Sequence, residues 1–268
     1  MRSVKNGQSG LHNMIRLSER LQRIAERVPS GGKLADIGSD HALLPAYLAI
    51  NGTISRGIAG EVNTGPYEAA SKQIEQSGVG HKVQARLGDG LAVIQPGEVN
   101  VITIAGMGGS LISSILEAGK EKLSGVELLI LQPNVGEEFV REWLLRSNWS
   151  LQSEQILEED GKIYEILTAQ PKQLGASGDG LYEPFMLNGE ISVTKQDLLR
   201  MGPYLLRNPN PVWIRKWESE LAKLAQICRQ LSRSEHTASR QKEQEIREIM
   251  QHIEEVLACL QKVKPSFN

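Results

Sequence analysis

One structural unit recurs along the first half of this chain: an apolar strand, a turn that carries glycine and a carboxylate, and a helical segment. Its turns cover residues 36–41, 59–61 and 88–90, and a fourth turn without charge covers residues 105–109. Strands that alternate with helices in this way form a parallel sheet with right-handed crossover connections. A ligand of such a sheet binds beyond the carboxyl ends of the strands, so the four turns are predicted to line one pocket.

The order of the predicted elements indicates an α/β fold with seven strands. A helix is expected from Leu17, and residues 29–32 end it. The strands and helices that follow are predicted at 33–37, 41–50, 56–60, 63–77, 83–87, 100–105, 108–118, 126–132 and 137–146. Two more strands, 150–157 and 163–169, flank a turn and indicate a hairpin. This order favours a Rossmann-like sheet of the class I methyltransferase type over a six-stranded dinucleotide-binding sheet.

The sequence changes in character near residue 170. A linker mixture covers 170–180, and 181–208 is expected to hold a short helical region. Apolar residues then recur at helical spacing in two long stretches: Trp217, Leu221, Leu224, Cys228 and Leu231, then Ile246, Ile249, Ile253, Val256, Leu260 and Val263. This spacing predicts an antiparallel coiled coil with a bend at 232–239, although two amphipathic helices packed on the first domain would show it too.

We therefore expect three segments in this chain. Residues 1–13 are polar and without periodicity, which indicates a disordered extension. Residues 14–170 are predicted to form a methyltransferase domain, and residues 171–268 a helical coiled-coil domain.

Composition and charge exclude several classes of protein. The net charge of −2 rules out a polycation, and no apolar run approaches the roughly 18 residues of a membrane helix. No apolar signal segment opens the chain, so a cytoplasmic protein is expected. Cys228 and Cys259 are the only cysteines. They are too few for a disulfide framework or a zinc site, and no metal is expected.

The carboxylates in the turns indicate what kind of ligand the pocket binds. Phosphate sites use backbone N–H groups and basic side chains, whereas this pocket is rimmed by Asp36, Asp40, Glu61 and Asp89. Acidic turns suit the ribose, the amines and the sulfonium of S-adenosyl-L-methionine. The residues expected to bind this cofactor are Asp36, Gly38, Ser39, Glu61, Asp89, Gly90, Ala105, Gly106, Met107 and Gly108.

Each motif also has a simpler explanation. Asp36 and Gly38 could form a bare turn, because Asp40 and Ala42 stand where a dinucleotide fingerprint has its second and third glycines. Glu61, however, lies 23 residues after Gly38, at about the position of an acid that binds a ribose diol. Four such turns in the right order make a stronger case than any one of them.

Two further segments are candidates for contact with the substrate. Gln132, Pro133 and Asn134 close the fifth predicted strand, where uncharged amides offer donors and acceptors to a base. The same residues would also form an ordinary turn before the next helix. His41, beside Asp40, is either a substrate contact or a residue that orients the first turn.

Six motifs together resemble the bacterial tRNA adenine-22 N1-methyltransferase family. They are Asp36-Ile37-Gly38-Ser39-Asp40-His41, Ala59-Gly60-Glu61, Gly88-Asp89-Gly90, Ile104-Ala105-Gly106-Met107-Gly108-Gly109, Leu131-Gln132-Pro133-Asn134 and Glu158-Glu159-Asp160-Gly161-Lys162. The resemblance runs from about Leu17 through Ala169 and continues more loosely into the helical tail. It implies a class I methyltransferase domain, a C-terminal coiled coil, S-adenosyl-L-methionine as cofactor, and methylation of adenine N1 in the D-arm region of bacterial tRNA.

The fourth turn agrees with a ring nitrogen as the target. Enzymes that methylate exocyclic amines commonly carry an Asn/Asp-Pro-Pro-aromatic motif after the fourth strand, where this chain has Ala105-Gly106-Met107-Gly108. Adenine N1 has an in-plane lone pair and needs no deprotonation, but the methylated ring is a cation. A nearby carboxylate stabilises that charge, and Asp40 is the predicted catalytic residue.

Binding of tRNA by a chain without a large positive charge requires local basic patches. The first patch is predicted on one face of the first helix and consists of Arg16, Arg20, Arg23 and Arg27. The second is predicted on the first coiled-coil arm and consists of Arg215, Lys216, Lys223, Arg229 and Arg233. A solvated basic face would explain the first patch equally well. The target base must be flipped out or already unstacked, and we expect a monomer.

Three alternatives stay open. A methyltransferase of the same fold could act on another RNA or on a small substrate. A nicotinamide-dependent dehydrogenase would share the first turn and Glu61, but the chain lacks the fingerprint glycines and an evident hydride-partner histidine. A non-catalytic interaction module could use the coiled coil alone, which would leave the acidic turns unexplained.

Overall fold

The computed structural model describes residues 15–172, 180–233 and 236–263 of the chain, with side chains to residue 261. The predicted disordered extension at 1–13 and most of the predicted linker lie outside the described residues. In the part that is described, every helix is too short or too polar to cross a lipid bilayer.

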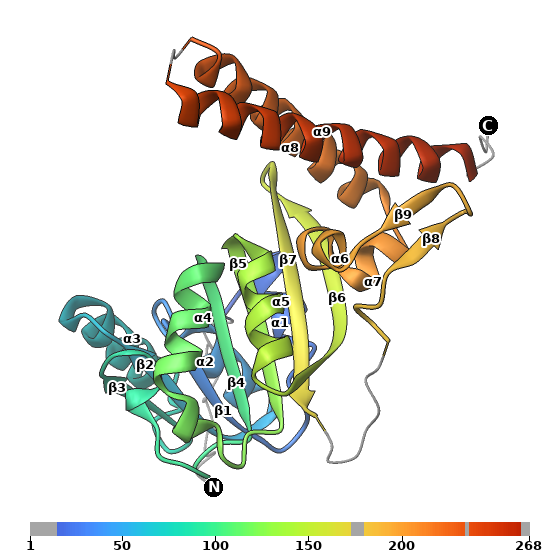
Figure 1. Cartoon of the computed structure of the whole chain (residues 1–268). Helices are drawn as coiled ribbons and strands as arrows, with labels where there is room; N and C mark the ends of the chain where they lie inside the picture. Colours follow the sequence, from blue (N-terminus) through green and yellow to red (C-terminus); the bar gives the residue numbers. More distant parts are fainter. Residues whose placement is uncertain (1–14, 173–179, 234–235, 264–268) are drawn as a thin grey trace, which may run out of the picture.

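A mixed sheet of seven strands forms the centre of the larger part of the molecule (Figure 1). Its order is β3-β2-β1-β4-β5-β7-β6, and β7 is the antiparallel strand. The bounds are β1 Gly32–Ile37, β2 Ile54–Glu61, β3 Val83–Leu87, β4 Val101–Gly108, β5 Leu128–Val135, β6 Trp149–Glu159 and β7 Lys162–Pro171. This order confirms the predicted seven-stranded Rossmann-like sheet with its terminal hairpin.

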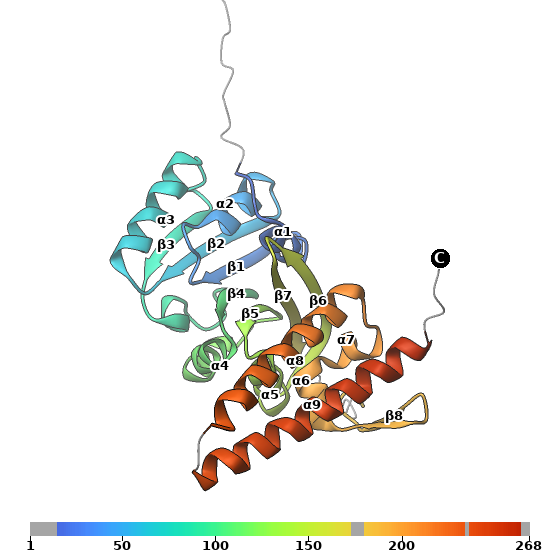
Figure 2. The ribbon, with the colours of Figure 1, turned by 90° about the horizontal axis from the view of Figure 1, so that it is seen from above.

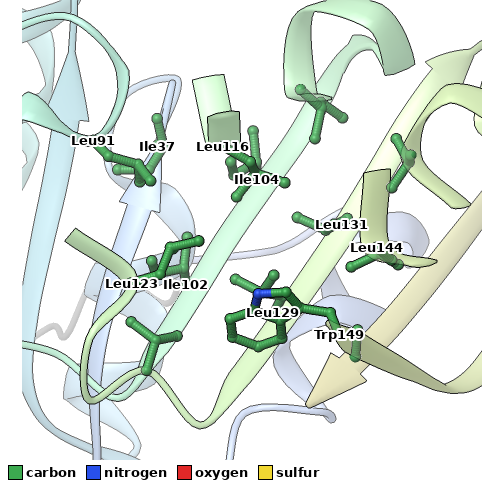
Figure 3. Close-up of a cluster of buried hydrophobic side chains, with 14 of the residues drawn as sticks. Ile37, Leu91, Ile102, Ile104, Leu116, Leu123, Leu129, Leu131, Leu144 and Trp149 are labelled. Atoms are coloured by element: carbon green, nitrogen blue, oxygen red, sulfur yellow. The ribbon is translucent and has the colours of Figure 1, made fainter. Parts of the chain in front are cut away.

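Helices cover both faces of the sheet, which explains why its central strands are apolar on both sides. One face carries α1 Glu19–Ala25, α2 Leu43–Ile50 and α3 Thr64–Gln76. The other face carries α4 Gly109–Ala118, α5 Glu137–Arg146 and the short 3₁₀ turns Gly90–Val93 and Lys120–Leu123. Figure 3 shows the apolar core between the sheet and α4 and α5. In this core, Ile102 and Ile104 of β4 and Leu129 and Leu131 of β5 lie close to Leu116 and Leu144.

The segment after the sheet contains a β-hairpin that the sequence reading missed. Strands β8 Phe185–Leu187 and β9 Ile191–Val193 pair antiparallel. Asn188 and Gly189 both have positive φ, of 50° and 74°, as a tight reversal requires. The expected helical region is therefore limited to α6 Lys195–Met201 and α7 Pro203–Arg207.

Two long helices, α8 Pro211–Leu231 and α9 Thr237–Val263, lie side by side and run in opposite directions (Figures 1 and 2). One apolar cluster contains Trp213 and much of the predicted seam: Trp217, Ile253 and Val256 are buried in it, and Leu221, Leu224, Ile249 and Leu260 are partly buried. The same apolar cluster includes Ile156 of β6 and Leu205 of α7. The helical pair therefore packs on itself and, at its base, on the hairpin. Coiled-coil geometry in the strict sense stays a prediction.

A chain of buried charges joins the sheet to the C-terminal elements. Arg141 on α5 is fully buried, and its guanidinium binds the carboxylates of Glu154 on β6 and Glu165 on β7. Lys216 on α8 donates to Glu165 and to Glu137 at the start of α5, each at 2.6 Å. Three acids and two bases thus meet from four elements. We call these five residues the Arg141 network.

Main-chain groups of the C-terminal segment complete this network. Arg141 Nη1 donates to the carbonyl oxygens of Leu199 and Arg200 at 3.0 and 3.3 Å, and Glu154 Oε2 accepts from the Tyr204 N–H at 2.8 Å. Burial lowers the pKa of Arg141, but the facing carboxylates outweigh it and hold that pKa above its usual value. We still propose a domain boundary near residue 170. The residues before and after that boundary share these buried contacts.

Arg141→Met should lower the free energy of unfolding by about 3–5 kcal/mol, because it leaves Glu154 and Glu165 buried without their cation. Arg247→Met is the control, since the exposed Arg247 pairs with Glu243 on its own helix and such pairs contribute about 0–1 kcal/mol. Urea unfolding followed by circular dichroism measures both values. Equal losses for the two variants would contradict the structural role of the network.

Candidate cofactor and substrate site

Asp36, at the carboxyl end of β1, connects the first turn to β4. Its side chain is buried, and its carboxylate accepts hydrogen bonds from Ser39 Oγ at 2.6 Å and Thr103 Oγ1 at 2.5 Å. Burial raises the pKa of Asp36 to about 6, against the opposing effect of these two bonds. Both carboxylate oxygens are thus engaged within the protein, and Asp36 fixes the turn that begins at Gly38.

The loop after Gly38 has a strained backbone. Asp40, His41 and Ala42 have φ angles of 45°, 68° and 57°, in the left-handed region that is costly for residues other than glycine. The Asp40 N–H donates to Glu61 Oε1 at 2.7 Å, which ties the loop to the end of β2. The Asp40 carboxylate itself is 90% exposed, with His41 Nε2 at 3.5 Å. The loop therefore holds a solvent-facing carboxylate in place.

Glu61, at the end of β2, lies next to the end of β3. The residue is 6% exposed, and burial raises the pKa of its carboxyl group. Strand pairing places it beside Leu87, and both Leu87 and Val62 expose about half of their surface. Asp89 lies two residues after Leu87, beyond the end of β3, and is exposed. An acid flanked by open apolar side chains suits a ligand that joins an aromatic ring to a diol.

Glycines bring the first and fourth predicted turns into contact. A Cβ on Gly38, whose φ is 67°, would lie 2.1 Å from Met107 Cε. A Cβ on Gly109, the first residue of α4, would lie 1.9 Å from the carbonyl oxygen of Gly136. The main chain excludes a side chain at Gly109, and the positive φ of Gly38 favours glycine there, so both glycines help the ends of β1, β4 and β5 to approach each other.

The segment from Ala105 to Gly108 is the irregular end of β4 rather than a turn after it. Ala105 pairs with Gln132, and Met107 pairs with Pro133, so Gly106 is an extra residue on the β4 side. Its φ of 78° is what such a bulge requires of glycine. The predicted cofactor residues of this segment therefore lie on a bulged strand end.

Gln132 holds this bulge in place. Its side chain is fully buried, and Oε1 accepts from the Gly106 N–H at 3.1 Å and from Arg20 Nη1 at 2.6 Å. Its Nε2 donates to the Pro133 carbonyl at 2.8 Å and to Asn134 Oδ1 at 3.1 Å, and Asn134 Nδ2 donates to the Gly106 carbonyl at 2.8 Å. Pro133 is buried and Asn134 is exposed, so Asn134 is the member of this predicted trio that can reach a ligand.

The four arginines predicted to share one helix face do not share it. Because α1 is limited to Glu19–Ala25, Arg16 precedes the helix and Arg27 follows it. Arg27 donates to Gln155 of β6, and Arg23 pairs with two neighbouring glutamates, Glu19 and Glu26. Arg20 donates to the side-chain amide of Gln132. The spacing of the arginines predicted a common face because the predicted helix extended beyond both ends of α1.

The second predicted basic patch also requires a correction. The side chain of Lys216 is only 12% exposed and is engaged by Glu137 and Glu165 of the Arg141 network, so it is not available to a phosphate. Arg215 pairs with Glu158 at 2.6 Å, and Lys223 pairs with a neighbouring glutamate. Arg229 and Arg233, in contrast, are exposed near the far end of α8. Among these residues, only Arg229 and Arg233 are exposed without a carboxylate partner in the described part of the chain, and both lie near the end of α8 that is far from Arg215 and β6.

Two features of this edge were missing from the sequence reading. Thr103 lies within an apolar strand, and a buried hydroxyl there signals a hydrogen-bond partner, here Asp36. Tyr164 on β7 lies under the Arg20 guanidinium, 5.3 Å from ring centroid to Cζ. Within the described ranges, no group of three His, Cys, Asp or Glu side chains is arranged to hold a metal ion.

Known proteins resemble this chain over most of its length. A family model described as TrmK, tRNA (adenine(22)-N(1))-methyltransferase, matches residues 34–257. The tRNA (adenine(22)-N(1))-methyltransferase of Bacillus subtilis (strain 168) is 45% identical over 246 residues, which are 91% of this chain and 98% of that protein.

Solved structures agree with this likeness. The crystal structure of the B. subtilis m1A22 tRNA methyltransferase TrmK has a TM-score of 0.80 and 43% identity, covering 91% of this chain and 99% of that one. A Streptococcus pneumoniae protein in complex with S-adenosyl-L-methionine has a TM-score of 0.74 and 40% identity, covering 90% of this chain and 100% of that one. With its acidic strand ends and its seven-stranded sheet, this chain therefore belongs to the TrmK family of tRNA (adenine(22)-N(1))-methyltransferases.

Proposed function

We propose that this chain transfers a methyl group from S-adenosyl-L-methionine to N1 of adenine 22 in bacterial tRNA. The observation that carries this proposal is the gathering of Asp40, Glu61, Asp89 and the Gly106 bulge at one edge of a methyltransferase-type sheet, in a chain of the TrmK family. The Bacillus subtilis relative is named for this reaction. The S. pneumoniae relative was solved with this cofactor.

The residues at the strand ends fit the cofactor chemically. Glu61 would accept hydrogen bonds from the ribose diol, with Val62 and Leu87 against the faces of the adenine ring and Asp89 near its amine. The main chain around Gly38 and the Gly106 bulge would lie close to the methionyl part, because neither glycine carries a side chain. Asp36 would act indirectly, by fixing the turn.

The reaction requires alignment and charge stabilisation, and needs no general base. When bound, the cofactor supplies an electrophilic methyl group on a sulfonium centre. The N1 lone pair of adenine lies in the ring plane, so this chain must hold the base edge toward that methyl group and exclude water. The positive charge of the methylated ring is stabilised by a fixed carboxylate, and Asp40 on its strained loop is our candidate. His41 and Asn134, both exposed, would contact the flipped base or its sugar.

The tRNA contacts would come from several elements. Arg229 near the end of α8 and Arg233 just after it are exposed and would bind phosphate at a distance from the reacting base. Arg23, in the last turn of α1 beside the β6–β7 hairpin, and Arg16, which precedes α1, would add further contacts. Such a spread of contacts fits a chain without strong net charge, because each cation is used locally.

Methyl transfer to an unmodified bacterial tRNA transcript tests this function directly. We expect 1-methyladenosine in the digested product, and a reverse-transcription stop at position 22, because N1 methylation blocks the pairing edge. A transcript with guanine at position 22 serves as the control and should accept no methyl group. Methylation at another position, or of an exocyclic nitrogen, would assign the chain to another substrate within the same fold.

Glu61→Ala should weaken cofactor binding by at least about 100-fold. Loss of two hydrogen bonds to a charged group costs about 1.5–3 kcal/mol each, and each 1.4 kcal/mol is about tenfold in affinity. Glu68→Ala, which removes an exposed glutamate from α3, is the matched control. Calorimetric titration with S-adenosyl-L-methionine measures both variants. Equal affinities would remove Glu61 from the site.

Asp40→Asn should lower the single-turnover rate of methyl transfer by about 10- to 100-fold and leave cofactor affinity nearly unchanged. Asparagine tolerates the left-handed backbone as aspartate does, and the Asp40 N–H that binds Glu61 is retained. The substitution therefore removes charge and keeps the loop. A wild-type rate for this variant would show that another group stabilises the cationic product.

A further inference from the structure

Arg20 carries a partly buried charge that no carboxylate of the described residues contacts directly. Its guanidinium binds the neutral amide oxygen of Gln132 at 2.6 Å and lies over the ring of Tyr164. Among the described residues, no carboxylate oxygen lies within 4.0 Å of its side-chain nitrogens. The contrast with Arg141 and Arg86 is clear, because each of those guanidinium groups binds at least one carboxylate directly.

The main chain of Arg20 is fixed by the β6–β7 hairpin. The N–H groups of Glu19 and Arg20 both donate to the Glu159 carboxylate. Glu159 thus already occupies the first N–H groups of α1, and the side chain of Arg20, rather than the helix terminus, is the group that faces the site. The anchored main chain, the Gln132 bond and the Tyr164 ring together leave the guanidinium little freedom.

The Arg20 guanidinium lies at the bulged end of β4. The oxygen of Gln132 that accepts from Arg20 also accepts from the Gly106 N–H. A Cβ on Gly106 would lie 3.8 Å from Arg20 Nη1. Burial dominates the raised pKa of Asp36, and the Arg20 charge is close enough to act in the opposite direction. Arg20 therefore lies among the residues of the candidate site, although it comes from a different part of the chain.

Most of the hydrogen-bonding capacity of Arg20 remains available. A guanidinium has five N–H donors in a planar fork that matches two oxygens of one anion. Within the described part of the chain, one side-chain nitrogen has an acceptor, Gln132, and the others have none. A charge that is partly removed from water is costly without an opposite charge, so the arrangement is suited to an anion that arrives with a ligand.

We propose that Arg20 binds a pair of anionic oxygens on a ligand of this site. The proposal rests on the proposed function, which offers two sources of such a pair: the carboxylate of the cofactor's methionyl end and a phosphate beside the target adenine. In both cases the forked donors orient the reaction partners by holding one end of a ligand next to the Gly106 bulge.

Arg20→Gln and Arg20→Lys test the proposal, with Arg56→Gln as the matched control. Arg56 is an exposed arginine near the amino end of β2, at the opposite edge of the sheet. Calorimetry gives the affinity for S-adenosyl-L-methionine and for its decarboxylated analogue. Steady-state assays give the KM for tRNA as a function of salt, and thermal melting shows whether each variant is folded.

If the anion is the cofactor carboxylate, Arg20→Gln should lose at least about tenfold in affinity for S-adenosyl-L-methionine and almost none for the decarboxylated analogue. If the anion is an RNA phosphate, cofactor affinity should be unchanged. The KM for tRNA should then rise at least about tenfold, and the log–log salt slope should become shallower by roughly 0.7–0.9. Arg20→Lys keeps the charge without the fork, so its loss should be intermediate.

Two results would overturn the proposal. The first is wild-type behaviour of Arg20→Gln in both assays. The second is an equal loss of affinity for both forms of the cofactor together with a lower melting temperature, which would assign Arg20 to the support of Gln132. The cofactor titrations need no tRNA, so a wild-type protein that fails to methylate tRNA would contradict the proposed function separately.

Discussion

The buried guanidinium of Arg141 is the interaction on which the arrangement of this molecule depends. It projects from α5 to the point where the β6–β7 hairpin and the end of α6 meet, and both of these supply oxygens to it. A cation in that position is tolerable only when all of its partners are in place. Lys216 extends the same requirement to α8. The elements after the sheet are therefore held in one orientation by charge, in addition to the apolar contacts around Trp213.

This orientation matters for function because α8 begins at the carboxyl edge of the sheet. Arg215 in the first turns of α8 pairs with Glu158 near the end of β6, and Lys216 pairs with Glu137, which follows β5. The helical pair thus starts beside the strand ends that form the candidate site and extends away from them (Figure 1). A large RNA could contact the far part of the pair while one of its bases reaches the sheet edge.

Strain at the site is concentrated where chemistry is proposed. Three consecutive residues, Asp40, His41 and Ala42, adopt left-handed backbone conformations, and this is stable only because surrounding contacts determine it. Glu61 holds the loop at one point, and the bond between Asp36 and Ser39 holds its start. The loop therefore presents the Asp40 carboxylate in a defined place without burying it.

The sequence by itself determined the sheet, the order of its elements and the edge at which the site lies. Apolar strands, glycine turns and helical periodicity are local signals, and the strand ends at Asp36, Glu61 and Asp89 follow from them. The Asn188-Gly189 turn was an equally local signal, and the hairpin it indicates could have been predicted from it. Only the tertiary structure decided how Gln132, Arg20, Lys216 and Arg141 are used. Each of these side chains is defined by partners far away in the chain, and a helical pattern cannot tell a solvated arginine from one that turns inward to a buried amide.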